Sequence, residues 1–168
     1  MFPLSLSFPP ASCYSRNREK NLIPEKRSRY ATNGETDLGK LLSTIKPSLS
    51  DERYAFVTTK LKMSELATIE PLALIAEDEG TTVIIEKGKA DANSLSYQGV
   101  FRRITLTVHS SLEAVGLTAA VASKLTEHGI SANVVAAFFH DHIFVPEDKA
   151  AMAMEALQEL VQENFAIG

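Results

Sequence analysis

The 168-residue sequence has one cysteine, no tryptophan and no long hydrophobic run. The single cysteine, Cys13, cannot form an internal disulfide, so a reducing compartment such as the cytoplasm is expected. No apolar stretch approaches the roughly 20 residues that a transmembrane helix needs, which argues against membrane insertion. Neither a G-x-G-x-x-G loop nor a P-loop is present, and we therefore expect no cofactor.

Positive charge is scarce in most of the chain. Residues 1–33 contain six Lys and Arg and two acidic residues, whereas residues 34–168 contain eleven and nineteen. An acidic folded part argues against non-specific nucleic-acid binding, which depends on the neutralisation of phosphates by Lys and Arg. The pair Arg102-Arg103 is too small a patch to change this, and we expect one or both side chains to flank a strand and face water.

Residues 1–33 have no periodic apolar face. Three of the first ten residues are proline, and the composition is typical of a disordered tail. The segment lacks the positive n-region of a secretory signal. Its Ser and Arg content is similar to that of an organelle transit peptide, so an organelle is the alternative to a cytoplasmic location.

The first half of the folded part predicts a helix, three strands and a short helix. A helix is predicted over 36–45, because four apolar residues are spaced as on one helix face: Leu38, Leu41, Leu42 and Ile45. Residues 53–59 predict a strand, and residues 71–87 predict two short strands around a turn at Asp78-Glu79-Gly80. Residues 88–95 can form a short helix.

The second half predicts the order β-α-β-β-α. Alternation over 101–109 indicates a strand, and the nearly continuous apolar run at 130–139 indicates a buried one. A turn at His140-Asp141 leads into a returning strand at 142–145.

Two helices accompany these strands. The first is predicted over 113–129, because Leu117, Val121 and Leu125 repeat every four residues and Gly129 suits the position after a helix end. Pro146 opens the last helix, at a position where proline is tolerated.

This order lacks the sixth element of a closed βαββαβ unit. Residues 165–168 are too few for a good strand, and an open apolar sheet edge is a liability. We therefore expect strands from 53–87 to complete or extend the sheet, so that the two halves interlock.

The stretch GLTAAVASKLTEHGI, residues 116–130, resembles the ACT domain. That family's pattern places a glycine at the helix start, an apolar residue five positions on, leucine nine positions on and Gly-Ile near the fourteenth. The matching residues are Gly116, Val121, Leu125 and Gly129-Ile130. The pattern departs at Val115, where proline is common, and at Thr118, where leucine is usual.

The resemblance covers about residues 35–163 and is strongest in the second half. The chain is similar to small bacterial tandem-ACT proteins of uncharacterised function and, more distantly, to CASTOR-type ACT pairs. It implies an α+β fold of ferredoxin-like βαββαβ modules in tandem, with mostly antiparallel sheets and helices on one face. The implied parts are a disordered tail at 1–33, a divergent N-terminal module at 34–97 and a C-terminal ACT domain at 98–168.

The candidate site lies where the predicted strands 101–109 and 130–139 end. A right-handed β-α-β crossover makes these strands parallel, so both end at one rim of the sheet. Helix amides near 112–116 favour an anion such as an amino-acid carboxylate, and Asp141 or Glu113 can bind the amino group. The expected ligand-binding residues are His109, Ser110, Ser111, Leu112, Glu113, Val115, Gly116, Leu117, His140 and Asp141.

The resemblance and this rim together favour a non-enzymatic regulatory protein that binds a small effector, an amino acid, and forms a homodimer. Nucleic acid and membrane are not expected partners. One alternative is an interaction module without a ligand that binds a partner enzyme. Another is a metal protein or enzyme that uses His109, His140, Asp141 and His142.

Two features of the rim also have purely structural explanations. Ser110 and Glu113 fit a capping box, which would stabilise the helix start by roughly 1 kcal/mol without any ligand. Gly116 is expected within the first turn and a half of the helix, where glycine costs about 1 kcal/mol relative to alanine. It indicates close approach of a ligand or of another backbone, and both readings remain open.

Deletion of residues 1–33 should leave the melting temperature essentially unchanged, because the segment offers no apolar face for packing. Thermal unfolding of the full chain and of the truncated chain, followed by circular dichroism, measures this. A large drop in melting temperature after truncation would show that the segment packs on the folded part.

Overall fold

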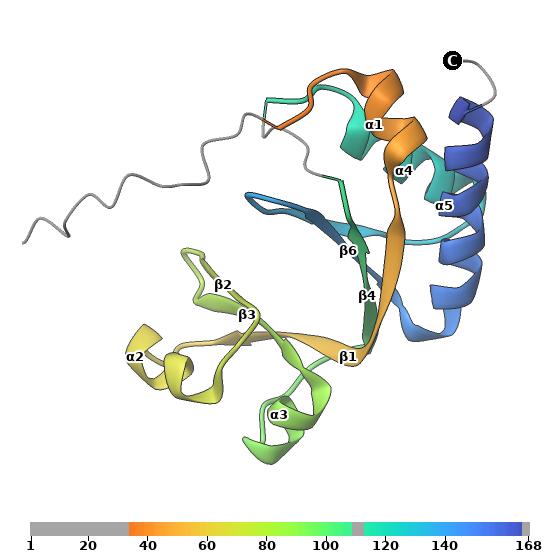
Figure 1. Ribbon diagram of the computed structural model, residues 1–168. Helices are drawn as coiled ribbons and strands as arrows, with labels where there is room; N and C mark the ends of the chain where they lie inside the picture. Colours follow the sequence, from red (N-terminus) through yellow and green to blue (C-terminus); the bar gives the residue numbers. More distant parts are fainter. Residues whose placement is uncertain (1–33, 109–112, 166–168) are drawn as a thin grey trace, which may run out of the picture. The chain divides into compact units, whose positions relative to one another are not determined.

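The computed structural model describes residues 34–108 and 113–165, which belong to one folded unit (Figure 1). The predicted tail at 1–33 and the site residues at 109–112 lie outside the described residues. No helix in the described ranges has the length and apolar character required to cross a membrane.

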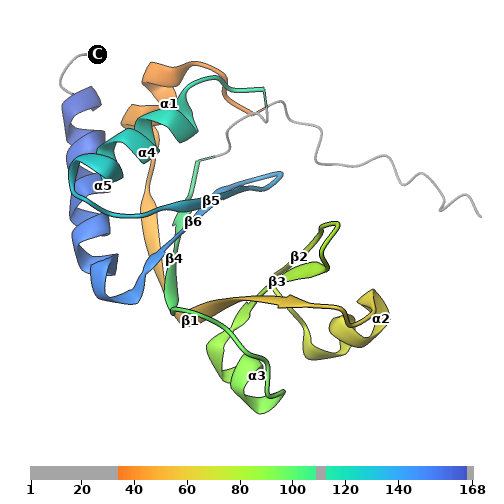
Figure 2. The same ribbon diagram turned by 180° about the vertical axis from the view of Figure 1, so that it is seen from behind.

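Six strands form one sheet in the order β2-β3-β1-β4-β6-β5, and every neighbouring pair is antiparallel (Figures 1 and 2). The prediction that strands of the first half extend the sheet of the second half is confirmed. The strands are β1 (Pro47–Thr59), β2 (Ala73–Ala76), β3 (Thr81–Glu86), β4 (Phe101–Leu106), β5 (Asn133–Ala136) and β6 (Asp141–Pro146).

Strand β1 joins the two halves of the sheet. Its first part pairs with β4 and its second part with β3, while Tyr54 pairs with Phe101 on one side and Glu86 on the other. The register with β4 shifts between Leu49 and Arg53, and such a bulge bends a strand. The sheet therefore curls at β1 (Figure 1).

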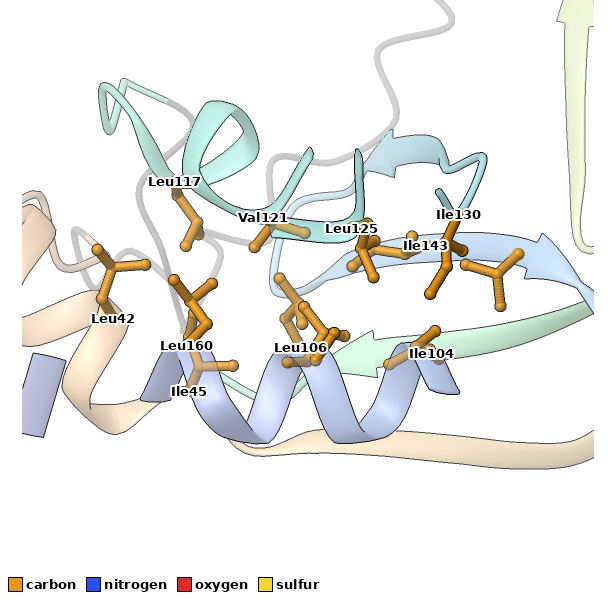
Figure 3. Packing of buried hydrophobic residues seen from close by; sticks show 14 of the residues in the cluster. Leu42, Ile45, Ile104, Leu106, Leu117, Val121, Leu125, Ile130, Ile143 and Leu160 are labelled. Atoms are coloured by element: carbon orange, nitrogen blue, oxygen red, sulfur yellow. The ribbon is translucent and has the colours of Figure 1, made fainter. Parts of the chain in front are cut away.

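Helices cover one face of this sheet, which we call the outer face. The main core lies there, where α1 (Leu38–Thr44), α4 (Leu117–Glu127) and α5 (Ala150–Phe165) pack on β4 and β6 (Figure 3). Ten of its residues are at most 1% exposed, among them Leu41, Leu106, Leu125, Ile143 and Leu157. A smaller core under α2 (Met63–Leu66) and α3 (Lys87–Ala92) contains Val57, Leu66, Val83, Ile85 and Ala90.

The opposite face, which we call the inner face, carries an aromatic cluster. The Phe56 ring contacts Phe101 and Phe144 edge to face, with centroids 5.2 and 5.3 Å apart, and Tyr54 contacts Phe144 at 5.6 Å. Edge-to-face packing is a favoured arrangement of aromatic rings. Ile84 of β3 joins the same cluster, so side chains from both halves of the sheet meet on the inner face.

Several predicted elements begin or extend differently from expectation. Strand β1 begins at Pro47 and not at residue 53, and the turn expected at His140-Asp141 ends at His140, because Asp141 already pairs in β6. The helix expected over 113–129 begins only at Leu117, because Gly116 occupies the N-cap position with φ of +101°. The buried strand expected at 130–139 is the four-residue edge strand β5, and Phe138 and Phe139 lie exposed in the turn that follows. Before Gly116 and after β5, apolar residues extend beyond the regular helix or strand into irregular backbone.

Replacement of Gly116 by alanine should destabilise the protein by about 1–3 kcal/mol, since a left-handed backbone disfavours any side chain. An alanine Cβ would also lie 2.8 Å from Leu38 Cδ2. Urea unfolding of the variant measures this loss.

Gly88→Ala is the matched control, because Gly88 lies inside α3 and a Cβ there meets nothing within 4 Å. Alanine should stabilise that helix by about 0.5–1 kcal/mol. Equal effects of the two substitutions would contradict the role of the Gly116 conformation.

Candidate functional site

The rim predicted from the crossover rule is present in the sheet. Strands β4 and β5 flank β6 and are antiparallel to it, so they run parallel to each other and end at the same rim. Strand β6 begins at this rim with Asp141, which lies opposite Leu106 of β4 and Ala136 of β5. The segment after β4 and the β5–β6 turn therefore meet, as expected.

Asp141 is the buried acid of this rim. Only 7% of the residue is exposed, and its register partner Leu106 belongs to the main core, so Asp141 lies on the outer face with the helices. Burial raises the pKa of the Asp141 carboxyl above its ordinary value, and the charge of nearby His140 opposes part of this rise. The rim thus contains a carboxylate that is costly to keep ionised without a partner of opposite charge.

His140 connects the turn to the segment after β4. Its Nδ1 atom lies 3.4 Å from the backbone carbonyl oxygen of Val108, and the residue is half-buried. The contact brings the β5–β6 turn directly against the chain that enters 109–112.

The described residues before α4 and at its first position differ in exposure. Leu117 is buried in the main core, whereas Val115 is 84% exposed and Glu113 is exposed as well. Gly116 approaches Leu38 of α1, which is a packing reason for a glycine at this position. Whether these residues bind a ligand stays a prediction, and His109, Ser110, Ser111 and Leu112 lie outside the described residues.

The helix amides available to an anion differ from those expected. The capping box expected of Ser110 and Glu113 involves Ser110, which lies outside the described residues. Helix α4 begins at Leu117 with Gly116 as its N-cap, and its first intrahelical bond runs from the Ala120 amide to the Gly116 carbonyl. The amides at the helix start are therefore those of Leu117, Thr118 and Ala119, and not those of 112–116.

The described members of the proposed metal set do not converge. His142 pairs with Thr105 across the strands and its Nδ1 lies 3.0 Å from Thr105 Oγ1 on the inner face, whereas Asp141 lies on the outer face. Successive residues of a strand point to opposite faces, which separates the two. Within the described ranges, no three His, Cys, Asp or Glu residues form a group that could hold a metal ion.

Two features away from the rim differ from what the sequence predicted. A pocket of about 620 Å³ opens beside the link between α3 and β4, and its lining includes Phe56, Thr58, Thr82, Ser96, Tyr97 and Gln98. Among the described residues that line this pocket, none has a charged side chain to match a zwitterion. The second feature is Arg102-Arg103: both residues are half-buried, which contradicts the expectation that they face water.

The comparisons with known proteins bear on both halves of the chain. One ACT domain family model matches residues 33–102, and a second ACT domain model matches residues 101–159. No curated protein matches the sequence significantly.

Solved structures with the same architecture include small proteins and regulatory subunits. VC0802 from Vibrio cholerae, described as a protein of unknown function and possible transport protein, is 48% identical with a TM-score of 0.69; the match covers 74% of this chain and 95% of that one. Atu0741 from Agobacterium tumefaciens is 16% identical with a TM-score of 0.59, covering 70% and 89% of the two chains. The regulatory subunit of aspartate kinase from Thermus thermophilus is 7% identical with a TM-score of 0.50, covering 71% and 98%.

The last two similarities, at low identity, extend to the fold alone. The match to the Vibrio cholerae protein spans nearly its full length at high identity, and the two family models together span residues 33–159 of this chain. The chain therefore belongs to the ACT-domain family and contains two ACT domains in tandem.

Proposed function

We propose that this protein is a non-enzymatic regulator that binds an amino acid at the rim between the end of β4, the start of α4 and the β5–β6 turn. The observation that carries the proposal is the buried carboxylate of Asp141 at this rim. A buried charge is stabilised by a partner of opposite charge, and the ammonium group of an amino acid supplies one.

The start of α4 supplies the complementary half of such a site. Its first amides, at Leu117, Thr118 and Ala119, lie at the positive end of the helix dipole, which favours a carboxylate. The proposed polar and apolar contacts precede these amides by a few residues in the chain, and they are His109, Ser110, Ser111, Leu112 and Glu113. A fold shared with a protein named as a regulatory subunit of aspartate kinase supports a regulatory role.

An interaction module without a ligand is the second candidate, and exposed apolar side chains favour it. Val115 is 84% exposed before α4, and Phe138 and Phe139 of the β5–β6 turn are 57% and 43% exposed. Such side chains suit contact with another protein. This candidate predicts no affinity for any amino acid.

We also propose that the protein forms a homodimer through a sheet edge. Strands β2 and β5 are the two edges of the sheet, and an uncovered edge readily pairs with another chain. The β2 edge is the more apolar, with Leu72 and Ile75 exposed by 41% and 45%.

Asp141→Asn should weaken amino-acid binding by about 1–3 kcal/mol, since it removes the charge that pairs with the ammonium group. Unfolding stability at neutral pH should not fall, because a buried acid with a raised pKa costs folding free energy where it is ionised. A thermal-shift screen of the amino acids identifies the ligand, and titration calorimetry measures its affinity.

The affinity should also depend on pH. It should rise as the pH increases through the raised pKa of Asp141, because only the ionised carboxylate attracts the ammonium group, and then level off. Asp78→Asn, in the exposed β2–β3 turn, is the matched control and should bind like the wild type. A screen without any amino-acid ligand would favour the interaction module.

The homodimer should have twice the 18.3 kDa mass of one chain in light scattering. Ile75→Lys should shift the protein to the monomer, because it places a charge on the proposed edge, whereas Met152→Lys on α5 should not. A monomer mass for the wild type at high concentration would refute the proposal.

A further inference from the structure

The inner face of the sheet carries polar side chains beside the aromatic cluster. Along β4, Ile104 and Leu106 face the main core, so Arg103 and Thr105 face the opposite side. Their partners on β6 are Phe144 and His142. Arginine, threonine and histidine therefore share one strip of the inner face.

Arg103 is a cation without an acceptor in this strip. Its guanidinium carbon lies 5.1 Å from the centroid of the Tyr54 ring, and its Nε atom is buried without a hydrogen-bond partner. Among the residues described, none accepts a hydrogen bond from Arg103 or forms an ion pair with it. The aromatic ring holds the guanidinium in place, but it does not satisfy the N–H donors.

Two nearby arginines, in contrast to Arg103, have acceptors or ion-pair partners. Arg102, one position earlier, donates from Nε and Nη2 to the Ser50 carbonyl oxygen at 3.1 and 2.5 Å. Arg53 is exposed and lies 3.9 Å from Glu147. A buried donor of a charged group that lacks an acceptor costs more folding free energy than a neutral donor that lacks one. The unpaired Nε of Arg103 therefore needs an explanation.

The groups around Arg103 supply further hydrogen bonds and no buried acid. Thr105 Oγ1 and His142 Nδ1 lie 3.0 Å apart. Burial lowers the pKa of His142, as do the charges of Arg103 and His140, so the neutral imidazole is favoured. Glu52 is exposed and bonded to the Ser50 hydroxyl. That hydrogen bond lowers the pKa of Glu52, and the charges of Arg103 and Arg102 add to the effect from a greater distance than an ion pair. Asp141 lies on the outer face.

We propose that the inner face carries a second binding site, in which Arg103 binds the oxyanion group of a small molecule, a carboxylate or a phosphate, assisted by Thr105 and His142. The planar guanidinium donates two parallel hydrogen bonds to either group. The site is separate from the rim, because Arg103 and Asp141 face opposite sides of the sheet.

The proposal is tested on the full chain by NMR of the arginine Nε–H groups, because the Arg103 signal reports on this site directly. Acetate and inorganic phosphate are titrated separately at constant ionic strength. A saturable shift of the Arg103 signal and of the His142 ring signals is expected with at least one probe. A response to phosphate alone identifies a phosphate ligand, and a response to acetate alone identifies a carboxylate.

Matched variants separate this site from bulk charge and from the rim. Arg103→Gln should weaken binding about tenfold or more, because a charge-assisted hydrogen bond is lost. Arg53→Gln removes the same charge at an exposed position and should bind like the wild type, as should Asp141→Asn.

Shifts that stay linear with both probes, or that persist with equal affinity in Arg103→Gln, would overturn the proposal. If Arg103→Gln does not fold, the wild-type Arg103 signal alone decides. The amino-acid site at the rim is tested by Asp141→Asn, so either site can fail without the other.

Discussion

Every layer of this protein depends on the hydrogen bonding of β1 along both of its edges. At Tyr54 the strand pairs with Phe101 on one side and Glu86 on the other, which ties β3 and β4 into one sheet. The bulge between Leu49 and Arg53 bends the strand. The bend explains how Ile84 of one half and Phe144 of the other meet in the inner aromatic cluster, while the described helices pack in the cores of the outer face.

The sequence predicts those parts of the fold that follow a clear period. Leu117, Val121 and Leu125 are spaced for one helix face, and all three are buried in the main core. The first half of β1 was missed, since its sequence PSLSDE is polar and begins with proline. The start of α4 was misplaced, because apolar residues before Gly116 resemble a helix although the glycine adopts a left-handed conformation.

The candidate site was likewise predicted only in part from the sequence. Topology alone predicts that the end of β4 and the β5–β6 turn share a rim, because crossover handedness fixes the strand directions. Which face a side chain occupies depends on register, and a difference of one position separates Asp141 from His142. The burial of Arg103 was not predicted, for a related reason. Alternation along β4 predicts that Arg103 and Ile104 face opposite sides of the sheet, but the curl of the sheet is what makes the face of Arg103 half-buried.

The double pairing of β1 also governs the order in which the chain can fold during synthesis. The start of β1 leaves the ribosome roughly sixty residues before its partner, since Pro47 pairs with Leu106 of β4. At about 5–20 residues per second, that edge stays unpaired for roughly 3–12 seconds. Helix α1 stays unpacked longer still, since α5, on which it packs, comes after β4 in the chain. The first ACT domain therefore cannot complete its packing until the second has been translated, and meanwhile the unpaired edge of β1 can pair with other chains.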